Sequence, residues 1–363
     1  MKRLVGTSRT YVDAGFSALV IDWQQLHGRH SLPWQQSRDP YRVWLSEIML
    51  QQTQVAAVIP YYQRFLSSFP DVFSLAQASN EQVMAHWSGL GYYTRARNLH
   101  ACAQRVVQEY DGEFPSQPEL LAQLPGIGRS TAAAIAAFSY GECAAILDGN
   151  VKRVFTRVFG IDGVPASKVI EDDLWLRAEA LMPPAGEPGK IQAYTQGLMD
   201  LGATLCTRSK PRCDDCPLKL RCVALADNRV TELPTKKPKK TIPAKKVMML
   251  LILDREQVLL EKRPPSGIWG GLYSLPELAY ADDLQVATVQ TALQPFGELD
   301  SMQQLKAVDH VFSHFRLEIT PLECRLKQRS RAVSEDTHIW YPLAQIGQAP
   351  LPAPIKKMLS RML

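Results

Sequence analysis

A lysine- and proline-rich segment divides this chain of 363 residues into two parts with different hydrophobic patterns. The segment from Thr235 to Lys246 contains six lysines and two prolines, so it cannot bury enough apolar surface to fold alone. Before it, over residues 15–223, apolar side chains recur at the three- and four-residue spacing of amphipathic helices, as in YRVWLSEIML. After it, the runs VMMLLIL and VLLEKR, separated by DREQ, predict two strands joined by a turn.

Length and composition agree with two hydrophobic cores. The chain is long enough for two domains, and 46% of its residues are hydrophobic. We predict an all-helical domain over residues 1–224, an extended linker over 225–246 and an α+β domain over 247–363. No stretch approaches the roughly 18 apolar residues of a membrane span, and the N-terminus lacks the apolar segment of a signal peptide. We therefore expect a cytoplasmic protein with no membrane partner.

Four of the seven cysteines lie close together in the sequence and predict a metal centre. They are separated by six, two and five intervening residues: Cys206, Cys213, Cys216 and Cys222. The spacing fits either a [4Fe–4S] cluster or a four-cysteine zinc site, and it favours iron because structural zinc usually uses two paired knuckles. Basic side chains in the same loop, including Arg208 and Lys210, indicate that the metal would hold a positively charged loop against phosphates. The net charge of +5 is compatible with nucleic acid but does not require it.

A glycine-rich turn and a downstream aspartate form a second candidate site. In LPGIGRSTAAAIAA, Gly126 and Gly128 flank one apolar residue and precede Ser130 and a strongly helical run. Such a turn can direct backbone N–H groups at a phosphate beside a helix N-terminus. Asp148 follows 20 residues after Gly128, at the expected start of another helix. Its local sequence is compatible with a helix cap or with a chemical role.

The hairpin, the aspartate and the cysteine spacing together resemble the helix-hairpin-helix DNA glycosylases that carry an iron–sulfur cluster. Within that superfamily, LPWQ, SEIMLQQTQV, GLGYYTRARNLH, ILDGNVKRV and MDLGATLCTRSKPRC are similar to the adenine glycosylases of the MutY type. The match runs from about Leu32 to Cys222. The resemblance implies a mainly α helix-hairpin-helix domain whose four cysteines bind a [4Fe–4S] cluster. It also implies a monomeric DNA repair enzyme, associated with the nucleoid, that acts on double-stranded DNA containing adenine opposite 8-oxoguanine or guanine.

Two carboxylates are the expected catalytic pair in this resemblance. Breaking the bond between adenine and deoxyribose requires protonation of the base and stabilisation of a sugar cation, as in glycoside hydrolysis. Glu47 is the candidate acid, because its helical neighbours Val43, Trp44 and Leu50 are apolar and burial raises the pKa of a carboxyl group. Asp148 is expected to remain ionised beside the electron-poor sugar. The resemblance therefore favours a chemical role for it, with capping as an additional role.

Two further polar residues complete the expected catalytic set. The resemblance assigns Asn150 the orientation of the water or of the carboxylates. Ser130 occupies the hairpin position at which bifunctional relatives place a nucleophilic lysine, and it is expected to act on the sugar side. Because serine cannot form a Schiff base, we predict base removal without strong strand cleavage.

Access to the adenine requires that the nucleotide be flipped out of the duplex. Gln52 and Tyr92 match family positions that insert into the DNA, with Tyr92 as a wedge beside the orphaned base. The residues that match positions lining the adenine pocket are Leu32, Trp34 and Gln196. Those expected to contact the DNA backbone are Gly126, Gly128, Arg208 and Lys210.

The C-terminal domain resembles a Nudix-like fold through KRPPSGIWGGLYSLPE. The stretch after Gly271 lacks the glutamate cluster that would hold Mg²⁺, so nucleotide hydrolysis is not expected. The motif HVFSHFRLEI matches the family's element for recognising 8-oxoguanine, with Phe312, Ser313 and His314 as the expected contacts.

Three other functions are compatible with parts of the sequence. The helical domain would also suit a bifunctional glycosylase/lyase of the endonuclease III type. It would equally suit a non-catalytic iron–sulfur protein that binds damaged DNA. The C-terminal domain would suit a nucleotide pyrophosphatase.

Overall fold

The computed structural model describes residues 13–187, 189–238, 241–264, 267–312, 314–330 and 337–362. Contacts between residues divide the chain into two compact units. The first unit consists of Met1–Ala76 and Ala101–Pro238, and the second consists of Gln77–His100 and Lys239–Leu363. The segment Gln77–His100 is thus grouped with the C-terminal part. The domain limits drawn from the sequence remain a prediction.

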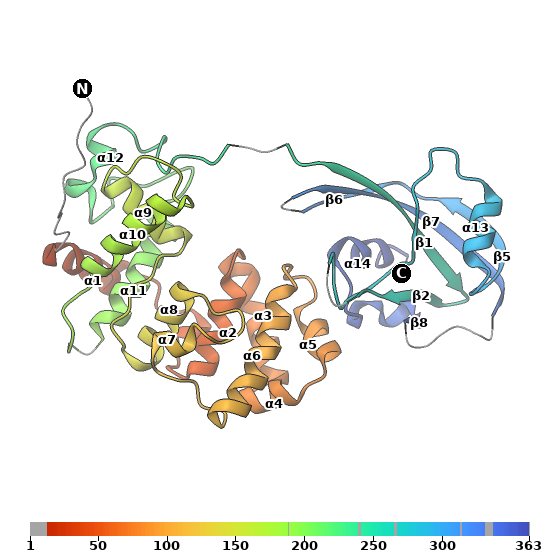
Figure 1. Ribbon diagram of the computed structural model, residues 1–363, viewed down its shortest axis with the longest axis horizontal. Coiled ribbons are helices and arrows are strands. Elements are labelled where there is room, and N and C mark those ends of the chain that lie inside the picture. Colours follow the sequence, from red (N-terminus) through yellow and green to blue (C-terminus); the bar gives the residue numbers. More distant parts are fainter. Residues whose placement is uncertain are drawn as a thin grey trace. The chain divides into compact units, whose positions relative to one another are not determined.

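The first unit is built from helices, as its hydrophobic periodicity predicts (Figure 1). Its longer helices are α1 (Ala14–His27), α2 (Pro40–Leu50), α3 (Val55–Ser68), α8 (Arg129–Tyr140), α9 (Gly149–Val158), α10 (Lys168–Ala180) and α11 (Lys190–Asp200). Its shorter elements are η1 (Pro33–Gln35), α4 (Val72–Gln77), α7 (Pro118–Leu121), η2 (Leu201–Leu205), η3 (Lys219–Arg221) and α12 (Val223–Ala226). Helix α6 (Thr94–Tyr110) begins in the second unit and ends in the first.

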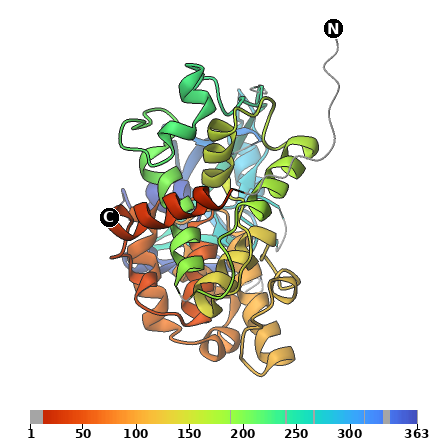
Figure 2. The same cartoon turned by 90° about the vertical axis from the view of Figure 1, so that its left-hand side faces the viewer.

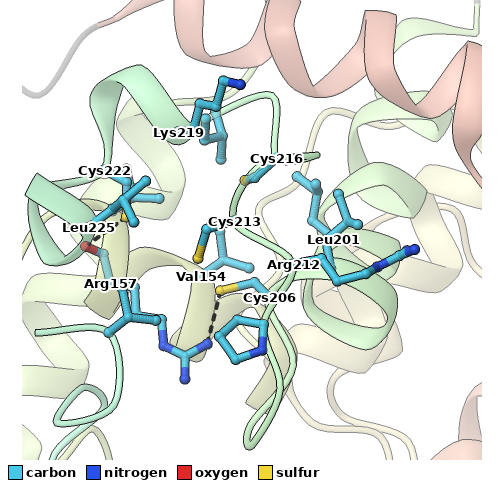
Figure 3. A pocket seen from close by; sticks show the side chains of 15 residues that line it. Val154, Arg157, Leu201, Cys206, Arg212, Cys213, Cys216, Lys219, Cys222 and Leu225 are labelled. Atoms are coloured by element: carbon cyan, nitrogen blue, oxygen red, sulfur yellow. Dashed lines mark hydrogen bonds between the residues drawn. The ribbon is translucent and has the colours of Figure 1, made fainter. Parts of the chain in front are cut away.

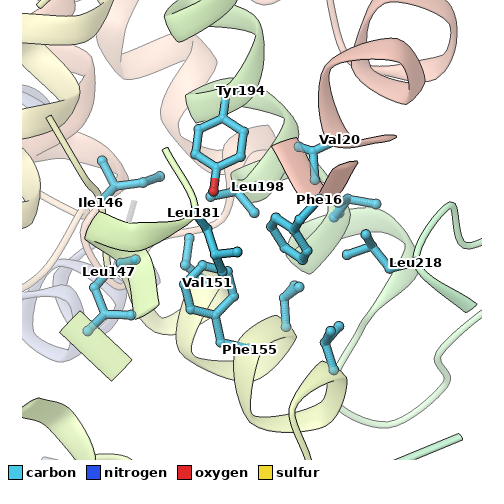
Figure 4. Packing of buried hydrophobic residues seen from close by; sticks show 14 of the residues in the cluster. Phe16, Val20, Ile146, Leu147, Val151, Phe155, Leu181, Tyr194, Leu198 and Leu218 are labelled. Atoms are coloured by element: carbon cyan, nitrogen blue, oxygen red, sulfur yellow. The ribbon is translucent and has the colours of Figure 1, made fainter. Parts of the chain in front are cut away.

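The core of the first unit fixes the position of the candidate catalytic aspartate. Helix α9 buries residues at the spacing i, i+3, i+4 and i+7, which is the apolar stripe of an amphipathic helix. Helix α1 packs against α11 (Figure 2). Both helices contribute to the same core as α9, with the side chains of Phe16, Val20, Val151, Phe155, Tyr194 and Leu198 (Figure 4). Ile146 and Leu147 are buried in this core and lead directly into Asp148, so packing holds the start of α9.

The second unit contains a mixed β-sheet. Its strands are β1 (Ala244–Asp254), β2 (Gln257–Lys262), β3 (Tyr273–Ser274), β4 (Glu277–Leu278), β5 (Gly297–Gln304), β6 (Val308–Val311), β7 (Arg316–Arg329) and β8 (His338–Pro342). Its helices are α5 (Asn80–Trp87), α13 (Val286–Leu293), η4 (Leu343–Gln348) and α14 (Ala353–Leu359). One continuous path through the sheet has the order β3–β2–β1–β7–β5; β4 pairs with β1, β6 with β7 and β8 with β2.

The sheet confirms the expected strand, turn and strand after the linker. Strands β1 and β2 are antiparallel, with Leu253 opposite Val258, and DREQ supplies the turn between them. The neighbouring pair β1–β7 is parallel, from Ala244 opposite Arg316 to Leu253 opposite Arg325. Strands β6 and β7 form a hairpin, and Phe312 and His314, two of the expected lesion-recognition residues, lie between them. Among helices of the described ranges, we find none whose length and hydrophobicity would suit a bilayer crossing.

Candidate functional site

A cavity of about 400 Å³ lies in the first unit and is lined by side chains from η1, α2 and α11. Three of the predicted site residues, Trp34, Glu47 and Gln196, line this cavity. Sequence reasoning missed other lining residues, which include Gln24, His30, Gln35, Arg38, Phe138 and Gln192. A signal was available for Gln192, because it precedes Gln196 by one helical turn and so shares its face of α11.

Leu32 is placed differently from the other predicted pocket residues, since it is not among the residues that line the cavity. Leu32 is the N-cap of η1, and its backbone N–H donates to Oε1 of Gln35 over 3.0 Å. The turn that it begins carries Trp34, whose ring is buried and meets Tyr62 edge-on with centroids 5.5 Å apart. Leu32 therefore supports the cavity wall through its backbone.

Helix α2 carries Glu47 into the cavity. The side chain of Asp39 caps this helix by accepting from the Tyr41 N–H over 3.0 Å, and Pro40 occupies the first turn. Trp44 and Ile48, on the turns around Glu47, are buried in the protein. Burial, and secondarily the negative charge of Asp148, raise the pKa of Glu47 to about 8. A carboxyl group with this pKa retains its proton at neutral pH.

Asp148 is the N-cap of α9 and is tightly hydrogen-bonded. Its Oδ1 accepts from the backbone N–H groups of Asn150 and Val151 over 3.1 and 2.8 Å. Its Oδ2 accepts from Nδ2 of Asn150 over 3.0 Å. Burial raises the pKa of Asp148, and these hydrogen bonds oppose that effect by stabilising the ionised form. Capping and a chemical role are thus compatible in one side chain.

Arg153 orients Asn150 and links it to the cysteine-rich loop. Its Nη2 donates to Oδ1 of Asn150 over 2.8 Å and to the carbonyl oxygen of Gly202 over 2.6 Å. Its Nε donates to the carbonyl oxygen of Cys206 over 2.7 Å. Asn150 in turn holds Asp148, so one guanidinium group joins the loop to the carboxylate. Sequence reasoning missed Arg153, although its spacing of three residues from Asn150 places both on one helix face.

The hairpin between α7 and α8 also reaches the aspartate segment. Oγ of Ser130 accepts from the backbone N–H of Leu147 over 2.9 Å, immediately before Asp148. Gly126 has a φ of +78°, a conformation that favours glycine. A side chain at Gly128 would meet open space, so the backbone here is accessible to a ligand.

The four clustered cysteines line one pocket of the first unit (Figure 3). The rest of its wall includes Val154, Leu201 and Leu205. Burial raises the pKa of the Cys216 thiol to about 11, so a thiolate there needs a cation beside it. Nη1 of the buried Arg157 donates to Sγ of Cys206 over 3.3 Å. Within the described ranges, no set of three or more side chains is arranged around a single metal ion. Four cysteine thiols that line one apolar pocket are nevertheless the donor set that iron–sulfur clusters use.

Both residues expected to insert into DNA have unusual backbone conformations. Gln52 has a φ of +57° and Tyr92 a φ of +49°, which side-chain-bearing residues rarely adopt. Gln52 is exposed, and the Tyr92 side chain is 53% exposed. Such strain at exposed positions is typical of functional sites. Arg208 and Lys210 are likewise exposed on the cysteine-rich loop.

A second cavity, of about 570 Å³, lies within the second unit and is lined by Tyr92, Arg97, Trp269, Phe312 and His314, among others. The ring of Phe312 stacks on Phe315 with centroids 4.5 Å apart, and Trp269 lies 5.7 Å from Phe312. Nη1 of Arg97 donates to the carbonyl oxygen of Gly270 over 2.7 Å and holds the loop beside Trp269. Ser313, the third expected contact, lies outside the described residues.

Comparisons with known proteins agree with both parts of this description. The sequence model of the HhH-GPD superfamily base excision DNA repair proteins matches residues 45–180, and that of the NUDIX domain matches residues 247–361. A solved thermostable thymine-DNA glycosylase is 28% identical, with a TM-score of 0.53, over 59% of this chain and 96% of that chain. The helical fold therefore defines a base excision DNA repair protein of the helix-hairpin-helix class, followed by a Nudix domain.

Curated relatives extend over nearly the whole chain. The adenine DNA glycosylase of Buchnera aphidicola subsp. Acyrthosiphon pisum is 39% identical over 345 residues, which cover 95% of this chain and 96% of the relative. The human adenine DNA glycosylase is 34% identical, over 83% of this chain and 65% of the human protein. This chain belongs to the adenine DNA glycosylase family.

Proposed function

We propose that this chain hydrolyses the N-glycosidic bond of adenine mispaired with 8-oxoguanine or guanine in double-stranded DNA, leaving the strand intact. The observation that carries the proposal is Glu47, which lines a cavity and has a pKa of about 8 beside Asp148. Cavities with convergent polar groups and perturbed carboxyl groups are typical of active sites. The adenine DNA glycosylase relatives support adenine as the base removed.

The two carboxyl groups divide the chemistry between them. Asp148 accepts three hydrogen bonds that stabilise its ionised form, whereas within the described ranges no hydrogen-bond donor contacts the Glu47 carboxyl group. A proton shared by the pair therefore belongs on Glu47 at neutral pH. Glu47 gives that proton to a ring nitrogen of the flipped adenine, and the bond to C1′ breaks with its electron pair going to the base. Asp148 stabilises the resulting sugar cation.

Water completes the reaction and restores the enzyme. A water molecule adds to C1′ and loses a proton to the Glu47 carboxylate, which returns the site to its starting state. Asn150, held by Arg153, orients Asp148 for this step. Ser130 has no amine with which to form a Schiff base, and its hydroxyl accepts from Leu147. We therefore propose a monofunctional glycosylase.

The second unit is proposed to recognise the base opposite the adenine. Its cavity combines an exposed wedge, Tyr92, with the aromatic turn that carries Phe312 and His314. Polar groups on this turn can pair with the N7–H and O8 edge of 8-oxoguanine, and one well-placed contact is worth about 1–3 kcal/mol. Helix α13 (VATVQTAL) contains no carboxylate that could hold Mg²⁺, so nucleotide hydrolysis is not part of the proposal.

The pocket of four cysteines is proposed to hold a [4Fe–4S] cluster. The cluster would tie the loop that presents Arg208 and Lys210 towards DNA phosphates. Through the Arg153 bond to Cys206, the same loop supports Asn150 in the active site. We propose that the protein acts as a monomer in the cytoplasm, at the nucleoid.

A strand-nicking assay on a duplex with adenine opposite 8-oxoguanine tests this function. We expect breaks at the adenine only after treatment with hot alkali, because hydrolysis leaves an intact abasic strand. Breaks without alkali, together with a borohydride-trapped adduct, would indicate a bifunctional glycosylase/lyase. Tight binding of the duplex without any adenine release would indicate a non-catalytic lesion-binding protein.

A further inference from the structure

An ion pair with a buried carboxylate adjoins Gln196, which lines the cavity that contains Glu47. Asp200, at the end of α11, is fully buried. Its Oδ2 accepts from the backbone N–H of Arg29 over 2.8 Å, and its Oδ1 accepts from Nε of Arg29 over 2.7 Å. Nη2 of Arg29 lies 2.6 Å from the same oxygen. A buried carboxylate with a charged partner and several donors has a defined orientation.

The same carboxylate determines how Gln196 faces the cavity. Nε2 of Gln196 donates to Oδ1 of Asp200 over 2.8 Å. An ionised carboxylate accepts hydrogen bonds and donates none, so only the amino side of the Gln196 amide can face it. In the described part of the chain, no donor contacts Oε1 of Gln196. That carbonyl oxygen is therefore the polar atom that Gln196 can offer to a base in the cavity.

The hydrogen-bond pattern of a purine at C6 distinguishes adenine from its closest analogues. Adenine carries an amino group there, which donates, whereas guanine and hypoxanthine carry a carbonyl oxygen, which accepts. A carbonyl oxygen in the cavity wall pairs with the first group and repels the second. Gln192 adds a similar group one turn earlier, because its Oε1 is buried without a partner among the described residues.

We propose that Arg29 and Asp200 are positioning residues that fix the carbonyl oxygen of Gln196 towards the base and thereby select 6-amino purines over 6-oxo purines. This inference rests on the proposed function and adds the origin of its base specificity. Arg29 also contacts the turn that carries Trp34, because its carbonyl oxygen accepts from Nε2 of Gln35 over 2.8 Å. Arg29 and Asp200 together thus connect the turn of Trp34 to the amide of Gln196.

The test compares single-turnover excision of adenine and of hypoxanthine, each opposite 8-oxoguanine, in the full chain. In Asp200→Asn, the amide of the new asparagine can donate to Oε1 of Gln196. The Gln196 amide can then flip, so that its Nε2 rather than its Oε1 faces the cavity. We expect the ratio of adenine to hypoxanthine excision to fall about 10–100-fold. A general loss of stability would slow both substrates and leave this ratio unchanged. Asp173→Asn is the matched control, since Asp173 pairs with Arg177 on α10, and its ratio should equal that of the wild type.

Two further variants keep the inference open to refutation. Gln196→Met removes the amide, so adding Asp200→Asn to it should change the ratio no further. Arg29→Lys keeps the charge but loses the forked contact, and its ratio should fall several-fold even if Asp200→Asn does not fold. If the ratio of adenine to hypoxanthine excision is unchanged in Arg29→Lys or in folded Asp200→Asn, the inference is overturned. It is also overturned if Asp200→Asn lowers this ratio equally in the wild type and in Gln196→Met. If the wild type releases no adenine, the proposed function itself fails.

Discussion

Replacing Glu47 by glutamine removes the proposed acid while keeping the size of the side chain. With a pKa of about 8, about nine-tenths of the molecules carry the proton at pH 7, whereas a glutamate with an ordinary pKa would carry it in about one in 300. General acid catalysis contributes about 10²–10⁴-fold to a reaction rate. We therefore expect Glu47→Gln to lower the single-turnover excision rate constant by about that factor.

The pH profile of excision provides the diagnostic measurement. Above pH 8 the wild-type rate constant should fall about tenfold per pH unit, because Glu47 loses its proton. The residual rate of Glu47→Gln should not show this decline. Binding to the lesion duplex, measured by fluorescence anisotropy, serves as the control and should change little. A variant rate within tenfold of the wild type, or an identical decline in both proteins, would refute the acid assignment.

Glu47→Gln should lower the excision rate but raise the stability of the protein at high pH. The pKa of Glu47 is higher in the folded state than in the unfolded state, so stability falls as the pH rises from about 4.5 to about 8. Glu47→Gln removes this loss and should be more stable than the wild type at pH 9, with an upper limit of about 5 kcal/mol. Denaturant unfolding at pH 5 and pH 9 measures the difference. Equal stabilities at pH 9 would contradict burial of the carboxyl group.

Three other substitutions test the surroundings of the carboxyl pair. Arg153→Ala leaves Asn150 without its orienting partner and should slow excision about 10²-fold with little change in duplex affinity, as single-turnover and binding assays would show. Ser130→Ala leaves the Leu147 N–H without its acceptor and should reduce the free energy of unfolding by about 1–3 kcal/mol, measured by denaturant titration. His314→Ala should reduce the preference for 8-oxoguanine over guanine opposite the adenine, measured as a ratio of excision rate constants, while leaving the rate with guanine nearly unchanged.

Part of the candidate site could be predicted because its signals are local. The apolar neighbours of Glu47 predict burial, and the acidic side chain before α9 predicts a cap, which the bonds from Asn150 and Val151 confirm. Gln192 carried a signal that was overlooked, since it lies one turn from Gln196. Leu32 shows the limit of this reasoning, because a motif does not reveal which of its residues reach the cavity: Trp34 lines it and Leu32 does not.

The sequence by itself determined the helical character of the first part, the β1–β2 hairpin and the spacing of four cysteines. Each of these depends on residues a few positions apart, whose periodicity or turn chemistry is visible in one sequence. Only the tertiary structure decided that β1 pairs in parallel with β7, that Arg153 reaches Cys206 and that Arg29 meets Asp200, 171 residues away. The physical reason is that hydrophobic periodicity indicates which face of an element is buried, but not which distant element covers it.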